Sequence, residues 1–146
     1  MFLKRTLDIA SLIQKKSYFL FGPRATGKSS LIKKELGHHA LIIDLLHSVI
    51  YSRLLMNQSQ LENIINAHIK DIHNTSTPQI IVIDEIQRIP ALLNEVHRLI
   101  EKYHYNFLLT GGSARKLKKI GVNLFGSEQD KPNYFPSLFM KLKILI

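Results

Sequence analysis

Residues 22–29 read Gly-Pro-Arg-Ala-Thr-Gly-Lys-Ser, and this segment constrains the fold more than any other part of the chain. It matches the pattern G-x-x-x-x-G-K-[ST], which requires a strand before it and a helix after it. Residues 18–21, Tyr-Phe-Leu-Phe, have the composition of a short strand. Residues 30–36 have helical composition and are followed by Gly37, which favours a helix end. The sequence therefore predicts a strand, a phosphate-binding loop and a helix in this order.

The residue types of this segment explain why it would bind phosphate. Gly22 and Gly27 permit backbone turns that are closed to residues with a Cβ, so that successive N–H groups form a nest around phosphate oxygens. The helix that begins near Lys28 adds free N–H groups, and the Lys28 ammonium reaches the β and γ phosphates. Ser29 offers a hydroxyl to Mg²⁺. The predicted contacts with a nucleoside triphosphate are Gly22, Pro23, Arg24, Ala25, Thr26, Gly27, Lys28 and Ser29.

Two alternatives stay open at this point. The segment is a phosphate-binding loop or a glycine-containing turn whose lysine is merely solvated. Arg24 reaches phosphate or faces solvent.

Length and composition place the chain among soluble globular domains. Its 146 residues form one domain by length and contain no Cys, which excludes a disulfide framework, a thiolate nucleophile and a Cys-based zinc site. The first residues lack the apolar stretch of a signal peptide, and no apolar run approaches the ~20 residues of a membrane helix. We expect a cytoplasmic protein without a membrane partner.

The charge balance favours polyanionic partners. Twenty Lys and Arg residues against eleven Asp and Glu residues give a net charge of +9. The basic residues come mostly in pairs, with one denser cluster at residues 115–119. Nucleic-acid binding and ordinary solvated helix surfaces both stay open as interpretations, because sequence does not show whether these residues share a face.

Hydrophobic periodicity predicts alternating strands and helices along the chain. Helices are expected at residues 7–13, at 30–36, as two helices between 45 and 73 divided near 57–59, and from Ile89-Pro90 to about residue 100. Strands are expected at residues 18–21, 39–44, 79–84 and 106–110, with a loop at 74–78. This alternation indicates an α/β fold with helices on both faces of a mostly parallel sheet.

A second chemical signal ends the β-branched run of residues 79–84. Asp84 at the end of a buried strand can hold Mg²⁺ opposite Ser29, usually through water. Glu85 can orient and deprotonate a water that attacks the γ-phosphate, which hydrolysis needs and transfer to a bound alcohol does not. The alternative is a pair of carboxylates that are solvated at a strand end. One strand-like segment separates this strand from the loop strand in sequence, which suits ATPases in which the two are not sheet neighbours.

Three motifs together resemble a known family. They are Gly-Pro-Arg-Ala-Thr-Gly-Lys-Ser-Ser-Leu at 22–31, Ile-Asp-Glu-Ile-Gln-Arg-Ile-Pro at 83–90 and Leu-Leu-Thr-Gly-Gly-Ser-Ala-Arg-Lys-Leu at 108–117. They are similar to those of prokaryotic AAA-type ATPases that carry an uncharacterised C-terminal domain after the ATPase core. The resemblance covers residues 1–124. It implies a three-layer P-loop NTPase fold of the ASCE type with the loop strand central, and ATP with Mg²⁺ as ligand. It also implies Thr110 as a polar sensor near the γ-phosphate and Ser30 as a contact of the α-phosphate.

The sequence departs from this family in two places. Gly112 stands where the family has the first serine of Thr-Gly-Ser-Ser, and after Leu124 the Ala-Gly-Arg segment and a long C-terminal domain are missing. We therefore divide the chain into an incomplete ATPase core at residues 1–124 and a divergent tail at 125–146, as expected of a truncated or frame-shifted gene product. Whether the tail forms a fifth strand or an exposed apolar end stays open. The missing arginine predicts low turnover.

Several functions compete at this stage. The leading hypothesis is an ATP-binding and ATP-hydrolysing core in which Lys28, Glu85 and Thr110 act in catalysis, while Ser29 and Asp84 organise Mg²⁺. The alternatives are a nucleotide-binding fragment without significant turnover, a small-molecule kinase, and an NTPase associated with nucleic acid. Self-association is also expected, because an arginine supplied by a neighbouring subunit needs assembly.

Overall fold

The structure of the chain, a computed structural model, describes residues 17–21, 28–36, 40–71, 80–112 and 139–143. Its strands are β1 (Ser17–Phe21), β2 (Ala40–Asp44), β3 (Ile80–Asp84), β4 (Asn106–Gly111) and β5 (Phe139–Lys143). Its helices are α2 (Lys28–Leu36), α3 (Ser48–Met56), α4 (Gln60–Asp71) and α5 (Leu92–Tyr103), with a 3-10 turn, η2 (Ile86–Arg88), between β3 and α5.

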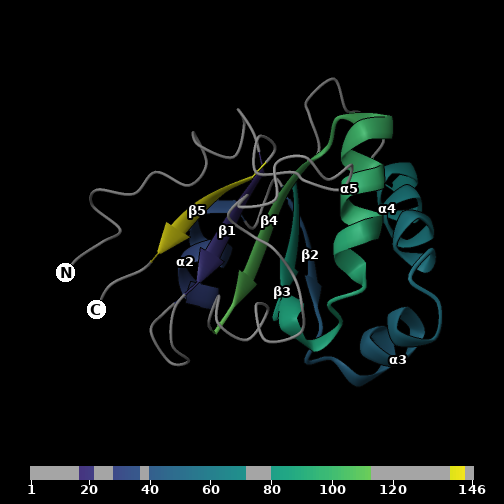
Figure 1. Cartoon of the computed structure of the whole chain (residues 1–146), viewed down its shortest axis with the longest axis horizontal. Helices are drawn as coiled ribbons and strands as arrows, with labels where there is room; N and C mark the ends of the chain where they lie inside the picture. Colours follow the sequence, from purple (N-terminus) through teal and green to yellow (C-terminus); the bar gives the residue numbers. More distant parts are fainter. Residues whose placement is uncertain (1–16, 22–27, 37–39, 72–79, 113–138, 144–146) are drawn as a thin grey trace, which may run out of the picture.

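The strands form one parallel sheet in the order β2-β3-β4-β1-β5 (Figure 1). β4 therefore separates β1 from β3, and β1 is paired on both sides. This confirms the expectation that the loop strand lies inside the sheet and is not a neighbour of the strand that ends at Asp84. Parallel pairing also brings the carboxyl ends of all the strands to one edge of the sheet.

Two clusters of buried side chains cover the two faces of the sheet. Because side chains alternate along a strand, Phe19 and Phe21 of β1 pack toward α3, α4 and α5, while Tyr18 and Leu20 pack toward α2. Figure 1 shows this layering, with α2 on one side of the sheet and the other three helices on the opposite side. The predicted three-layer α/β fold is confirmed.

The structure corrects two predicted helix starts. We expected Ile89-Pro90 to open a helix, but α5 begins at Leu92. The chain first makes turn bonds from the N–H of Leu92 to Ile89 O and from the N–H of Leu93 to Pro90 O, at 3.0 Å each. The helix expected from Leu45 begins at Ser48 instead, because the Leu45 N–H donates to Asp84 O at 3.2 Å and so stays beside β3.

The open question about the C-terminal tail has a partial answer. β5 pairs in parallel with β1, from Ser17 opposite Phe139 to Phe21 opposite Lys143. The helix expected at residues 7–13, the loop at 74–78 and the basic cluster at 115–119 lie outside the described residues.

Candidate functional site

Three elements meet at the carboxyl edge of the sheet. Asp84 is the last residue of β3, Thr110 lies at the end of β4, and Ser29 stands in the first turn of α2. Since β3 and β4 are neighbours and run in parallel, their ends lie side by side. The topology therefore gathers polar residues from distant parts of the sequence at one corner, which we call the Asp84 corner.

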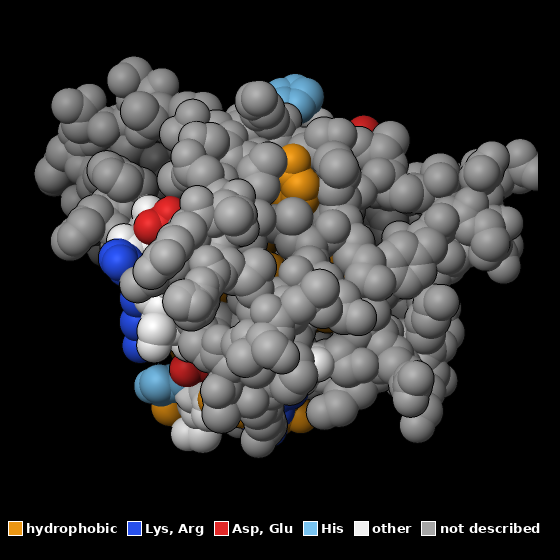
Figure 2. All heavy atoms as spheres, turned by 90° about the vertical axis from the view of Figure 1, so that its left-hand side faces the viewer, with side chains coloured by type: hydrophobic (Ala, Val, Ile, Leu, Met, Phe, Trp, Pro, Cys, Tyr) orange, Lys and Arg blue, Asp and Glu red, His pale blue; other side chains and the backbone are white. Residues whose placement is uncertain are grey.

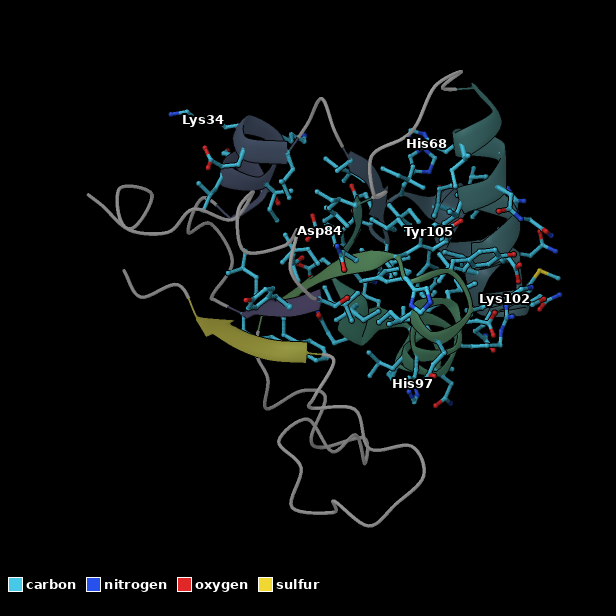
Figure 3. All side chains as sticks on the ribbon, turned by 90° about the horizontal axis from the view of Figure 1, so that it is seen from above. Lys34, His68, Asp84, His97, Lys102 and Tyr105 are labelled. Atoms are coloured by element: carbon cyan, nitrogen blue, oxygen red, sulfur yellow. The ribbon has the colours of Figure 1, made fainter. Side chains whose placement is uncertain are left out.

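The carboxylate of Asp84 joins these elements. The hydroxyl of Ser29 donates to Asp84 Oδ2 at 3.3 Å, and the hydroxyl of Thr110 donates to Asp84 Oδ1. In Figure 3, Asp84 lies between the side of the molecule that carries Lys34 of α2 and the side that carries Lys102 of α5. The structure therefore places Ser29 beside Asp84, the two residues that the sequence predicts on opposite sides of a Mg²⁺ ion.

Thr110 also fixes the residue that follows Asp84. Its side chain is fully buried, with 0% of its surface exposed, and its hydroxyl oxygen accepts the backbone N–H of Glu85 at 3.3 Å. The hydroxyl thus donates to one carboxylate and accepts from the next peptide. A residue without this hydroxyl would leave a buried N–H group unpaired, which costs about 1–3 kcal/mol.

Glu85 adopts a backbone conformation that most residues avoid. Its φ of 65° and ψ of 48° lie in the left-handed region, which costs roughly 1–2 kcal/mol for a residue with a Cβ. Its surface is only 6% exposed. The carboxylate accepts a hydrogen bond from Gln87 Nε2, with 2.5 Å between Nε2 and Glu85 Oε1. Glu85 is therefore held inside the Asp84 corner.

While the amide nitrogen of Gln87 makes this contact, its carbonyl oxygen, Oε1, stays unpaired. Oε1 is buried, and no donor among the described residues lies within hydrogen-bond distance of it. A Cβ added at Gly111 would lie 2.5 Å from the same oxygen, so a side chain at this end of β4 would require the Gln87 amide to shift. An unpaired buried acceptor costs about 1–3 kcal/mol.

The next residue anchors η2 to the neighbouring segment. Arg88 Nη1 donates to Leu45 O at 2.8 Å, and its guanidinium carbon lies 4.3 Å from the centre of the Tyr51 ring. These contacts join the end of β3 to the connection between β2 and α3. They hold the backbone on which Glu85 and Gln87 stand.

Not every predicted site residue can be placed. Gly22, Pro23, Arg24, Ala25, Thr26 and Gly27 lie outside the described residues, as does the side chain of Lys28. Lys28 begins α2, as expected, and Ser30 in the same turn is exposed. The structure thus brings together Ser29, Asp84, Glu85 and Thr110 of the predicted site.

Sequence reasoning missed Gln87 as a site residue. It stands within the quoted segment 83–90, two positions after Glu85, but a glutamine near a strand end carries no distinctive chemistry. Its role depends on the left-handed turn at Glu85, which carries the chain back toward its own carboxylate. The glycine at 111 is a signal that was available, since a glycine at a strand end often marks a close approach.

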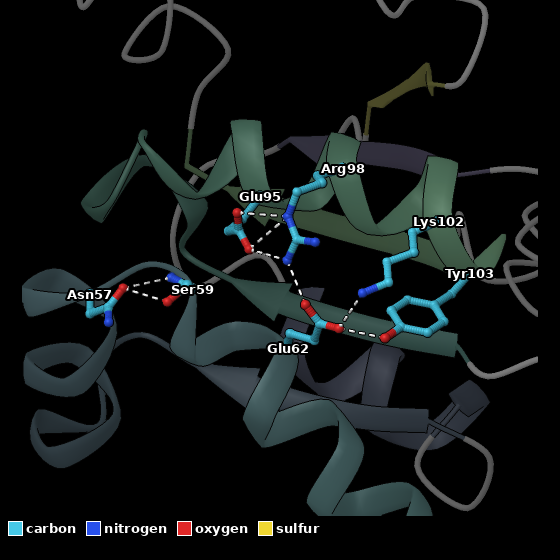
Figure 4. Close-up of polar contacts among 7 residues, drawn as sticks. All are labelled: Asn57, Ser59, Glu62, Glu95, Arg98, Lys102 and Tyr103. Carbon is cyan, nitrogen blue, oxygen red and sulfur yellow. Dashed lines mark hydrogen bonds and ion pairs between the residues drawn. The ribbon is translucent and has the colours of Figure 1, made fainter.

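A second polar cluster lies on the other side of the molecule, between α4 and α5. The Glu62 carboxylate accepts hydrogen bonds from Arg98 at 2.6 Å, from Lys102 at 3.1 Å and from the Tyr103 hydroxyl (Figure 4). Arg98, followed by Tyr103 and Lys102, lowers the pKa of Glu62 to about 2. Glu95 and Glu62 in turn raise the pKa of Arg98. We call this group the Glu62 cluster.

Comparison with protein families identifies the class of the chain. The model of the AAA domain family matches residues 14–140, and the chain belongs to this family. The match extends past residue 124, where our motif-based resemblance ended. Comparison with curated proteins gives no match. Membership of the family supports a nucleotide-binding function of the ATPase type.

Solved structures with the same fold are distant in sequence. A chain of Drosophila ORC bound to AT-rich DNA and Cdc6 superposes with a TM-score of 0.52 at 12% identity, over 97% of this chain and 53% of that one. The complex with GC-rich DNA gives 0.53 at 11% identity, over 97% and 54%. C. elegans PCH-2 gives 0.47 at 19% identity, over 76% and 37%. The chain thus spans about half the length of the two Drosophila chains, and the likeness supports the fold alone.

None of the described helices is long and apolar enough to cross a bilayer.

Proposed function

We propose that the chain binds ATP with Mg²⁺ and hydrolyses it slowly at the Asp84 corner. The observation that supports this most is the 3.3 Å contact between the Ser29 hydroxyl and the Asp84 carboxylate. It joins the first turn of α2, which follows the Gly-Lys-Ser motif, to the end of β3, which leads into Glu85. This contact supports a site in which α2 binds the phosphates and the end of β3 supplies the base.

The donor atoms at this corner suit Mg²⁺. Ser29 and Asp84 present a hydroxyl and carboxylate oxygens, the hard ligands that Mg²⁺ prefers, and no group of three or more His, Asp or Glu side chains forms a metal cage among the described residues. A Mg²⁺ ion that arrives with ATP would be held by Ser29 and Asp84, directly or through water. It would neutralise charge on the β and γ phosphates.

The phosphates themselves would lie over the start of α2. The N–H groups of a helix start point along its axis and attract anions, and α2 begins at Lys28. In this proposal the Lys28 ammonium contacts the β and γ phosphates, residues 22–27 surround them, and Ser30 contacts the α-phosphate. Thr110 holds the Asp84 carboxylate and the Glu85 peptide in register with them.

Glu85 would act as the general base. The oxygen of a water attacks the γ-phosphorus, the bond from that phosphorus to the β–γ bridging oxygen breaks, and the proton of the water passes to the Glu85 carboxylate. ADP and phosphate are then released. A kinase would use a bound alcohol in place of water, and a carboxylate next to the metal-binding aspartate serves hydrolysis better.

Slow turnover follows from the position of Glu85. With 6% of its surface exposed and its carboxylate bonded to Gln87, the base is not presented to a water in this conformation. The competing proposal is a chain that binds ATP without significant turnover. Measured affinity combined with measured phosphate release separates the two.

Nucleic-acid binding is a second candidate, favoured by the net charge of +9. The Drosophila ORC structures are bound to DNA. In this chain, however, most of the excess positive charge lies outside the described residues. In Figure 2 the described Lys and Arg side chains gather at one margin of the face shown, with Asp and Glu side chains near them. We propose that the chain binds a nucleotide in preference to nucleic acid. We also propose that it associates with further copies of itself.

The test is a calorimetric titration of the full chain with Mg-ATP. Lys28→Ala should weaken binding at least about tenfold, since it removes a charge-assisted contact with phosphate. Lys33→Ala is the matched control, because Lys33 is exposed on the same helix. Equal affinities for Lys28→Ala and the parent, or an equal loss for Lys33→Ala, would refute the assignment of the loop.

A further inference from the structure

We infer that Gln87 is a positioning residue that withdraws the Glu85 carboxylate from the attacking water, and that this contact opens before ATP is hydrolysed. The inference rests on the proposed function, because it concerns when Glu85 acts as a base. It assigns a role in the timing of hydrolysis to Gln87, to which the sequence analysis gave no role.

The contact itself supports a withholding role. Gln87 Nε2 lies 2.5 Å from Glu85 Oε1, and Glu85 is buried. A general base must reach the proton it takes, directly or through one water. While Oε1 accepts the N–H of a neutral amide of its own turn, this oxygen does not face the proton of an attacking water.

The closed arrangement carries two unfavourable features, one in the backbone of Glu85 and one in the side chain of Gln87. The backbone of Glu85 is left-handed, and Gln87 Oε1 is buried with no donor among the described residues. Unfavourable local geometry of this kind persists only where the surroundings impose it, and it occurs often at switch regions. A ligand that prefers the open arrangement therefore has little to overcome.

A substitution at Gly111 tests the contact between Gln87 and Glu85 without changing either residue. A Cβ at this position would lie 2.5 Å from Gln87 Oε1 and 3.7 Å from Phe21 Cδ1, so a methyl group there would displace the amide before anything else. Gly111→Ala should thus weaken the hold on Glu85 without altering a carboxylate or a phosphate contact.

Two other roles for Gln87 predict different results. If the amide preorganised Glu85 for catalysis, its removal would slow the reaction. If it only stabilised η2, its removal would lower the melting temperature and leave the rate per folded molecule unchanged. The sign of the rate change at saturating ATP therefore distinguishes the three roles.

The experiment is single-turnover hydrolysis of bound Mg-ATP by the full chain, with affinity measured in parallel. Gln87→Met keeps the length of the side chain and removes the amide. We expect its rate to rise about tenfold at unchanged affinity, which corresponds to about 1.4 kcal/mol. Gly111→Ala should raise the rate in the same direction. The two changes combined should exceed neither by much, because they act on one contact.

Two controls make the outcome decisive. Gln60→Met makes the same substitution on α4 and should leave the rate at the parent value, and Gln87→Met combined with Glu85→Gln should lose the whole gain. A Gln87→Met rate at or below that of the parent, including no measurable hydrolysis by either, overturns the inference. If Gln87→Met fails to fold, Gly111→Ala carries the same test. The proposed function fails separately, if the parent does not bind Mg-ATP or if Glu85→Gln is as fast as the parent.

Discussion

Two glutamates in this molecule are held in contrasting ways. Glu62 accepts hydrogen bonds from a guanidinium, an ammonium and a phenol, in the cluster that joins α4 to α5. Glu85 accepts one from a neutral amide, and it stands on a left-handed backbone at the end of β3. The first carboxylate is surrounded by cations, and the second is buried without one among the described residues.

The difference fits a stabilising role for Glu62 and the proposed role of Glu85 as a general base. Cationic partners favour the ionised form of Glu62 and hold it in place, so its charge is used to join two helices. A carboxylate that has to take a proton is better served by a single weak partner, which it can leave. Glu85 has that arrangement, next to an aspartate that is already tied to Ser29 and Thr110.

The largest expected effect is the slowing of ATP hydrolysis when Glu85 is replaced. Glu85→Gln should slow single-turnover ATP hydrolysis by about 10²–10⁴-fold, because an amide can hold a water but cannot take its proton. Glu62→Gln, the matched change at the other glutamate, should leave the rate within about twofold per folded molecule. Equal slowing by both substitutions would contradict a catalytic role that is specific to Glu85.

A second effect concerns the hydroxyl that links Asp84 to Glu85. Thr110→Val keeps the shape of the side chain and removes the hydroxyl, so the buried Glu85 N–H loses its acceptor. Denaturant unfolding should show a loss of about 1–3 kcal/mol. Ser52→Ala removes an exposed hydroxyl on α3 and should change stability by less than about 0.5 kcal/mol. Equal stability of Thr110→Val and the parent would contradict the contact.

A third effect concerns stability and pH. The folded pKa of Glu62, about 2, lies below its ordinary value of 4.5. Its contribution is therefore complete above pH 4.5 and is lost as the pH falls toward 2. Glu62→Gln should reduce the free energy of unfolding by about 1 kcal/mol at pH 7.

Unfolding at several pH values checks this prediction. The gap between Glu62→Gln and the parent should shrink as the pH falls below 4.5. Glu101→Gln, an exposed glutamate on α5 whose Oε1 lies 3.2 Å from His97 Nε2, serves as control and should show a smaller gap at pH 7. A gap for Glu62→Gln that stays constant down to pH 2.5 would show that its charge does not matter.

The smallest expected effect concerns the Tyr103 hydroxyl in the Glu62 cluster. Tyr103→Phe removes one of the three donors and should lower stability by about 0.5–1 kcal/mol in thermal unfolding. Combined with Glu62→Gln it should add less than the two single losses, because both act on one contact. Strict additivity would mean that the hydroxyl and the carboxylate are not coupled.

The elements of the sheet were largely predictable from the sequence. Every described strand from β1 to β4 was expected within a residue or two, because β-branched and aromatic runs bounded by turn residues give a strong local signal. The nearness of Ser29 and Asp84 follows from motifs that we expected to act on one Mg²⁺ ion, and their role as its ligands stays a prediction. The start of α5 was wrong because Pro90 suits a first helical turn, while the turn bonds around η2 decide where the helix begins.

The contacts of the two glutamates were not predictable in the same way. Glu62 lies 36 and 40 positions before Arg98 and Lys102, and only the packing of α4 on α5 brings them together. The role of Gln87 depends on the left-handed backbone of Glu85. Such a conformation is hard to predict from sequence at a residue other than glycine. Contacts set by helix placement or by backbone strain thus escape a reading of local patterns.

We propose that the Asp84 corner holds the triphosphate of Mg-ATP and presents Glu85 to the γ-phosphate. The decisive experiment is a crystal structure of the full chain with Mg²⁺ and a non-hydrolysable ATP analogue. We expect the metal beside Ser29 and Asp84, the β and γ phosphates at the start of α2, and the Glu85 carboxylate parted from Gln87. Phosphates bound elsewhere on the molecule, or a metal that contacts neither Ser29 nor Asp84 even through water, would contradict it.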